Sequence, residues 1–150
     1  MAEFSIQRQP IVGREDEVEE LERQAVPIEE VYGSLPERIL YRELIRRRAV
    51  FSLHQPIQGT YGVSGAIIVD FYFYDRPLIT EVYGVFIHER GRLRDPDREN
   101  RIRELEPEKE LSIIWDYEVY DRDVRERWLV QNVDAALLGA PVRVEYGEEG

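Results

Sequence analysis

Residues 69–84 carry the most informative segment of the chain, VDFYFYDRPLITEVYG. Its two halves are rich in aromatic and β-branched residues, and the DRP sequence at 75–77 is typical of a tight turn, so the segment predicts an antiparallel hairpin. Asp70 and Glu81 then lie on neighbouring strands in otherwise apolar sequence. Because burying an unpaired carboxylate is costly and two close carboxylates repel each other, we expect the pair to hold a cation, share a proton or face solvent in a cleft.

Further strands are predicted on both sides of this hairpin. Val, Ile, Phe and Tyr are frequent in three successive segments, at about 50–57, 63–74 and 78–88. Such segments, separated by turn residues, predict a three-stranded meander. The apolar segment LSIIW at 111–115 predicts a fourth strand.

Three helices are predicted from capping patterns. The sequence SLPE at 34–37 combines an N-cap serine, a proline in the first turn and an acid three residues after the cap, so a helix should begin there. A second helix is expected at about 95–106, between the start signal Asp95-Pro96 and the stop signal Pro107. A last helix, capped by Asp121 or Asp123, should extend to about Leu138, with Gly139 ending it.

These elements follow the order α-β-β-β-α-β-α, which predicts an α/β fold (α+β, with a mixed sheet). We divide the chain into an N-terminal acidic arm (1–33), a folded domain (34–140) and an acidic tail (141–150). The arm should contain a short helix near 14–24. It is interpreted either as a docking element for a protein partner or a second subunit, or as a solvated helix flanked by linkers.

The composition restricts the chemistry. The chain of 150 residues has no cysteine, which excludes disulfides, thiolate catalysis and zinc–thiolate sites, and its two histidines, His54 and His88, argue against a metal site built mainly of histidine. Lys109 is the only lysine, so the other nineteen of the 20 basic residues are arginines, which are poor general bases. The net charge of −11 argues against a non-specific binder of nucleic acid.

Localisation is predicted from the absence of targeting patterns. No run of 18 apolar residues exists, and the first eight residues, MAEFSIQR, resemble neither a secretory signal nor a transit peptide. We therefore expect a soluble, unprocessed chain in the cytoplasm, with no membrane partner.

Several short motifs occur in an order that resembles a known superfamily. They are LPERILY (35–41), QPI (55–57), VDF (69–71), EVYG (81–84), His88, and Asp97-Arg98 followed by Arg101. Their order and spacing, over roughly residues 34–125, resemble the PD-(D/E)XK nuclease superfamily, and within it the small endonucleases similar to very-short-patch-repair enzymes.

The resemblance implies a restriction-endonuclease-like αβββαβ core with a C-terminal helix, and a metal-dependent DNA endonuclease that hydrolyses phosphodiester bonds. It implies that Asp70 and Glu81 are metal ligands, that the Val82 carbonyl completes the inner sphere, and that Glu37 assists through water or a second metal. Mg²⁺, or Mn²⁺, suits hard oxygen ligands of this kind.

Residues beyond the carboxylates are further candidates for the site. His88 would orient a phosphate or donate a proton, although a lone histidine at a strand end is also a common surface residue. Arg94, Arg98 and Arg101 would grip DNA phosphates. The acids interleaved with these arginines, Glu99, Glu104 and Glu106, make ordinary surface ion pairing the alternative.

Each candidate acid also has an interpretation without function. Glu37 is the acidic member of a capping box, a role that does not exclude a second one. Asp70 would share a face with Tyr72 and Tyr74 in a regular strand, so a solvated sheet face is its alternative. Tyr83 stands where the general superfamily pattern has a lysine.

A second hypothesis follows from that departure and from the acidic charge. The chain would be a catalytically inactive nuclease-like fold, used as a structural or interaction module in a viral particle or another multiprotein assembly. It would then be virion-associated, with the arm and tail contacting neighbours. By analogy with other nucleases, a homodimer is a further arrangement that we consider.

Overall fold

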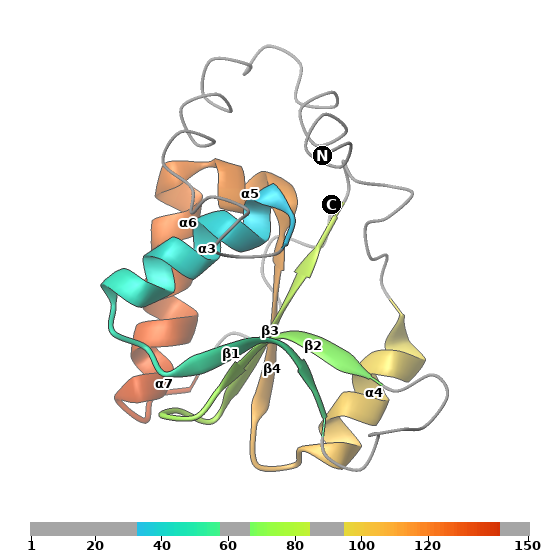
Figure 1. Ribbon diagram of the computed structural model, residues 1–150. Coiled ribbons are helices and arrows are strands. Elements are labelled where there is room, and N and C mark those ends of the chain that lie inside the picture. Colours follow the sequence, from blue (N-terminus) through green and yellow to red (C-terminus); the bar gives the residue numbers. More distant parts are fainter. Residues whose placement is uncertain (1–32, 58–66, 85–94, 142–150) are drawn as a thin grey trace.

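Four strands form one open, mixed sheet in the computed structural model, which describes residues 33–57, 67–84 and 95–141 (Figure 1). The strands are β1 (Phe51–Pro56), β2 (Ile68–Phe73), β3 (Leu78–Tyr83) and β4 (Glu110–Trp115), and they lie side by side in sequence order. The first three are antiparallel, whereas β3 and β4 run parallel. The predicted meander, fourth strand and mixed α/β class are therefore confirmed.

The first described helix, α3 (Leu35–Arg46), begins as the sequence predicts. The Ser34 side chain accepts the Glu37 backbone N–H, and the Glu37 side chain accepts the Ser34 backbone N–H, so the capping box is complete. Its apolar stripe, Leu35, Ile39, Leu40 and Leu44, is buried against the sheet.

The remaining helices also follow the predicted signals, with one addition. Asp95 caps α4 (Pro96–Leu105), and Asp121 caps α6 (Arg122–Trp128), which continues through a π-helix, η1 (Leu129–Asp134), into α7 (Ala135–Leu137). Gly139 has φ 82°, which glycine adopts without strain, where the last turn ends. The addition is α5 (Asp116–Tyr120), a short helix directly after β4 that the aromatic and β-branched sequence did not predict.

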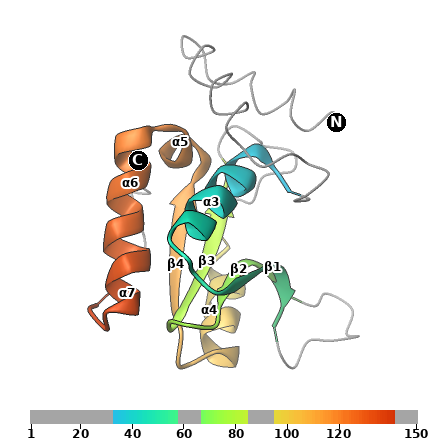
Figure 2. The ribbon, with the colours of Figure 1, turned by 60° about the vertical axis from the view of Figure 1, so that its left-hand side comes forward.

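The helices form two layers, one on each face of the sheet (Figures 1 and 2). The larger core lies between the sheet and α3, α5, α6, η1 and α7, and it includes Phe71, Phe73, Ile114 and Trp128. The smaller core lies beneath α4, where Ile102 meets Val69, Ile79 and Leu111. No helix among the described residues has the length and apolarity needed to cross a membrane.

The strands β1 and β2 change the face to which their apolar side chains point, and they do so at the same level. Leu53 and Phe71 belong to the larger core, whereas Ile57 and Val69 belong to the smaller one. In regular strands, residues two or four apart share a face, so both strands have lost regular alternation. The change coincides with His54, which has φ 57°, and with Asp70, its neighbour across the strand pair.

Several predictions fall on residues that the structure does not describe. These are the arm and its helix near 14–24, the tail beyond 141, the strand extensions at 63–66 and 85–88, and the site residues His88 and Arg94.

Candidate metal centre

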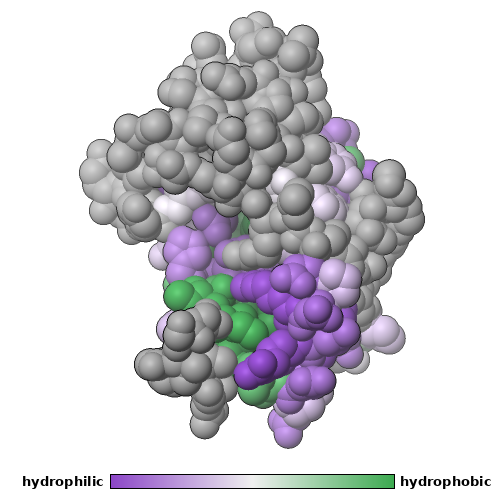
Figure 3. All heavy atoms as spheres, turned by 90° about the vertical axis from the view of Figure 1, so that its right-hand side faces the viewer, coloured by the Kyte–Doolittle hydropathy of each residue, from purple (hydrophilic) through white to green (hydrophobic). Residues whose placement is uncertain are grey.

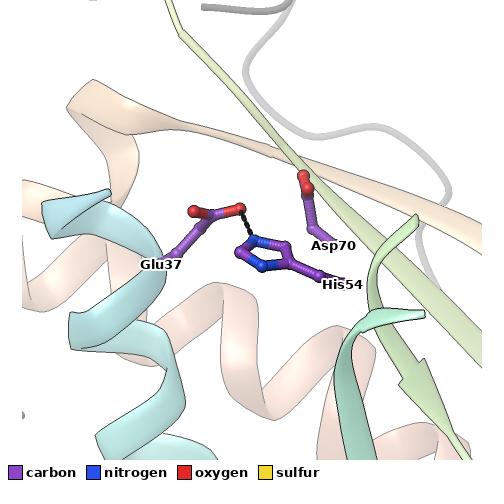
Figure 4. Close-up of side chains that lie close together, drawn as sticks. All are labelled: Glu37, His54 and Asp70. Carbon is purple, nitrogen blue, oxygen red and sulfur yellow. Dashed lines mark hydrogen bonds and ion pairs between the residues drawn. The ribbon is translucent and has the colours of Figure 1, made fainter. Parts of the chain in front are cut away.

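Three side chains from three separate elements meet between α3 and the strands β1 and β2 (Figure 4). Glu37 comes from α3, His54 from β1 and Asp70 from β2. One ligand atom from each, an imidazole nitrogen or a carboxylate oxygen, lies within 4.8 Å of the other two. This spacing allows the three atoms to coordinate one metal ion.

Helix capping positions Glu37. Its Oε1 accepts a hydrogen bond from the Ser34 backbone N–H at 2.8 Å, while Oε2 lies 3.0 Å from Nε2 of His54. One carboxylate oxygen therefore serves the helix and the other faces the cluster. The structural and functional interpretations of Glu37 are compatible.

The surroundings of Glu37 favour its ionised form. Burial by itself raises the pKa of this carboxyl, because a charge is poorly solvated there. The hydrogen bond and the electrostatic interaction with His54 oppose that effect, helped by the Ser34 N–H and by a hydrogen bond with Asp70. The net result is a pKa below the usual value, so Glu37 is a carboxylate at neutral pH.

His54 has a left-handed backbone and lies at the solvent side of the cluster. Its φ of 57° is uncommon for a residue with a Cβ atom and costs roughly 1–2 kcal/mol. The His54 side chain is 35% exposed, against 12% for the Glu37 side chain. Strained backbone of this kind concentrates at functional sites, and here it turns the imidazole toward Glu37.

Asp70 is buried, with only 4% of its surface exposed. Its Oδ2 accepts the Val82 backbone N–H at 2.7 Å. The alternative of a solvated sheet face is therefore wrong: the break in alternation separates Asp70 from Tyr72, which packs beside the smaller core. Its burial within reach of Glu37 and His54 leaves the functional interpretation of Asp70 in place.

Glu81 is completely buried next to Asp70 and has a positively charged neighbour. Its Oε2 accepts the Asp70 backbone N–H at 3.0 Å, and its Oε1 forms an ion pair with Arg98 of α4. Arg98 also donates to the Ile68 carbonyl at 2.9 Å. Glu81 is thus held between two strands and a helix, and it is outside the group of three ligand atoms.

The structure accounts for the other predicted residues as follows. The backbone N–H of Val82 binds Asp70, while Val82 itself pairs with Ile114 of β4. Arg98 faces Glu81, whereas Arg101 is exposed on α4. His88 and Arg94 lie outside the described ranges.

Tyr83 and Glu99 form a second buried polar pair. Tyr83 is fully buried, and its hydroxyl donates to Glu99 at 2.5 Å. Glu99 is only 1% exposed, so the alternative of surface ion pairing is wrong for this acid. Lys109 lies by the hairpin turn, where it donates to the Phe73 carbonyl at 2.6 Å.

Sequence reasoning did not include His54 in the site. Its signal is the strand register: Leu53 pairs with Phe71 and Gln55 with Val69, which places His54 opposite Asp70. That register was not readable, because residues 58–66 connect the strands over a length compatible with several pairings.

The arrangement itself, two carboxylates and an imidazole converging from α3, β1 and β2, is suited to a divalent cation. Comparison with protein-family models, with curated proteins and with solved structures finds no match to this chain.

Proposed function

We propose that this protein is a divalent-metal-dependent hydrolase of DNA phosphodiester bonds, with its metal held by Glu37, His54 and Asp70. The observation that carries the proposal is the convergence of the three ligand atoms within 4.8 Å. The substrate class comes from the resemblance to nucleases, whose element order α-β-β-β-α-β the chain shares.

The donor set fits a divalent cation with a preference for Mn²⁺ over Mg²⁺. Carboxylate oxygens suit both ions, whereas the imidazole of His54 suits transition metals better. The site also has one solvent-facing side, at His54, through which an ion and a substrate can approach. Of the two expected ions, Mg²⁺ and Mn²⁺, we therefore propose Mn²⁺ as the one that is bound more tightly.

The protein groups have separate tasks in this proposal. A bound divalent cation supplies an activated water and stabilises charge on the scissile phosphate. Glu37, ionised because of its lowered pKa, contributes charge and an oxygen ligand. Asp70 contributes a second carboxylate, whose orientation is fixed by the Val82 N–H.

Arg98 and Arg101 lie on α4, which covers the opposite face of the sheet from α3 and Glu37. Figure 3 shows this face, where hydrophilic side chains gather next to an apolar strip. Its exposed charges have both signs and include Asp97, Arg101, Arg103 and Glu104. Arg101 is the described arginine that we propose for a phosphate contact, since Arg98 already pairs with Glu81.

Nicking of supercoiled and branched DNA tests this function. Purified protein is incubated with Mg²⁺ or Mn²⁺, alongside Asp70→Asn and, as a matched control, Asp75→Asn in the same hairpin. Cleavage by the wild type and the control, lost in Asp70→Asn, supports the proposal. Equal cleavage by all three proteins would contradict it.

One set of observations favours a second function, the inactive structural or interaction module. Glu37, Asp70 and Glu81 all accept backbone N–H groups, so each acid stabilises the fold without a metal. Tyr83, at the position of the superfamily lysine, is buried against Glu99. Folded protein that binds neither Mg²⁺ nor Mn²⁺ in calorimetry, and that self-assembles stably, would support this function, with an assembly as its setting.

A further inference from the structure

Asp70 and the residues around it in the β2–β3 pair are connected by a network of ion pairs and hydrogen bonds to backbone groups. The backbone register pairs Phe71 with Thr80 and Tyr72 with Ile79, so its continuation sets Asp70 opposite Glu81. At this level, side chains accept the N–H groups that strand carbonyls would otherwise bind. The two carboxylates therefore continue the hydrogen bonding between β2 and β3 by one residue pair beyond the backbone ladder.

These bonds share the side chains of Arg98 and Glu81. Arg98 pairs with Oε1 of Glu81, which directs Oε2 of Glu81 to the Asp70 N–H. The Arg98 guanidinium also binds the Ile68 carbonyl on β2, so it links both strands to α4. A planar guanidinium is suited to such a two-sided contact, because its donors lie in a fixed fork.

The same groups remove Glu81 from metal binding. Its side chain has no exposed surface, and one oxygen binds Asp70 while the other faces a guanidinium. A metal ion at Glu81 would have to displace Arg98 and bring a second positive charge beside it. Asp70, by contrast, accepts the Val82 N–H through Oδ2 and has a carboxylate oxygen within 4.8 Å of the ligand atoms of Glu37 and His54.

We propose that Glu81 and Arg98 are positioning residues that hold Asp70 in its ligand orientation, and that Glu81 is not a ligand itself. This inference rests on the proposed function, since it concerns the metal of that site. It differs from the expectation drawn from the resemblance, in which Glu81 binds the metal directly and Arg98 binds DNA.

The two assignments predict opposite effects for Arg98→Ala. If Arg98 positions Asp70, its loss weakens Mn²⁺ binding by about 10–100-fold, as loss of a group that orients a ligand typically does. If Glu81 is a ligand that Arg98 neutralises, removing the arginine frees the carboxylate and strengthens Mn²⁺ binding. The sign of the change therefore decides.

Glu81 variants give an independent test if Arg98→Ala does not fold. Glu81→Gln keeps an oxygen that can accept the Asp70 N–H, so its Mn²⁺ affinity should fall less than about 10-fold. Glu81→Ala removes that acceptor, so its Mn²⁺ affinity should fall further. Asp70→Asn, a ligand change, should lose the most.

The measurement is Mn²⁺ affinity by calorimetry and by electron paramagnetic resonance, with folding of every variant checked by circular dichroism and thermal melting. Arg103→Ala, exposed on the same helix, controls for lost positive charge, and Glu104→Gln controls for lost negative charge. Because affinity is measured on folded protein, a purely stabilising role would move the melting temperature and leave affinity unchanged.

The outcomes separate this inference from the proposed function. Wild-type protein that binds no Mn²⁺ overturns the proposed function, and this inference with it. Wild-type binding combined with unchanged or tighter binding by Arg98→Ala, or with a Glu81→Gln loss equal to that of Asp70→Asn, overturns the inference alone. Weaker binding by Arg98→Ala, with Glu81→Gln close to wild type, supports it.

Discussion

The two ends of the β2–β3 hairpin hold charge in opposite ways. At the turn, cations donate to backbone carbonyls: Lys109 binds those of Phe73 and Arg76, and Arg76 binds that of Val133. At the other end, carboxylates accept backbone N–H groups from the paired strand. At the turn, Arg76 also pairs with Asp75, its neighbour in the sequence, whereas the opposite end brings together ligand atoms from three elements.

This difference shows why buried charge alone does not identify a site. Lys109 is the only lysine and lines a hollow with Tyr72, Tyr74 and Pro77, which by itself resembles a binding site. Its ammonium nevertheless has two carbonyl partners and lies 4.7 Å from the centre of the Tyr72 ring. What distinguishes the other end is convergence of groups that can share one ion.

The largest effect is expected from a substitution at the metal-site end of the hairpin that leaves the turn intact. Asp70→Asn replaces a charged ligand with a neutral amide that can still accept the Val82 N–H, so Mn²⁺ affinity should fall by about 100-fold or more while the fold persists. Calorimetry measures it, with Asp75→Asn at the turn as control. Equal affinities for the two variants would remove the contrast between the ends.

The next largest effect is expected from a substitution at the turn that leaves the metal site intact. Lys109→Met keeps the aliphatic stem but leaves two carbonyls without their donor, which should lower the free energy of unfolding by about 1–2 kcal/mol. Urea denaturation measures the loss, and Mn²⁺ affinity of the folded variant should match the wild type. A drop in affinity would show that the two ends are coupled.

A smaller effect separates strain from ligation at His54. Both His54→Gly and His54→Ala remove the imidazole and should weaken metal binding equally. Glycine tolerates the left-handed φ of 57° and alanine does not, so the glycine variant should be more stable by about 1 kcal/mol. Equal unfolding free energies would indicate that the backbone at this position has relaxed.

The smallest effect concerns the pH dependence at Glu37. Its pKa is lowered in the folded state, so ionised Glu37 adds stability above its unfolded pKa, and this stability is lost as the pH falls through the folded value. Glu37→Gln keeps the cap acceptor but not the charge. At neutral pH, the free energy of unfolding of the wild type should exceed that of this variant by less than about 1 kcal/mol. The difference should disappear in acid.

Urea denaturation of both proteins between pH 7 and the acid limit of the fold measures that difference. Glu104→Gln, on the exposed side of α4, serves as the control for a lost acid and should show no comparable pH dependence. A wild-type advantage that grows as the pH falls would contradict the sign of the Glu37 shift.

Most elements of the fold were predictable because their signals are local. The SLPE cap, the Asp95-Pro96 start and the Asp121 cap each satisfy N–H groups within one turn, so they act wherever the helix packs. The helix α5 was missed because its sequence, DYEVY, favours a strand. Its buried Val119 and Tyr120 in the larger core are tertiary contacts that propensity does not include.

The site was only partly predictable. Glu37 and Asp70 were identified from residue type and order, and the structure brings them together. The partners of Asp70 and Glu81 were not, because Arg98 reaches them from a helix that follows an intervening segment of the chain. The role of His54 depended on strand register and on one left-handed residue, and neither is encoded by a local pattern.

Apart from α5, the sequence by itself determined the element order, the mixed fold class, the helix starts and the presence of carboxylates in apolar strands, because these follow from local bonding and from the periodicity of apolar residues. Only the tertiary structure decided which charges meet. The break in strand alternation at His54 and Asp70, and the reach of Arg98 to Glu81, join residues far apart in the chain. Electrostatic and metal-binding properties depend on distances of a few ångströms between such residues, and packing of the whole fold sets those distances.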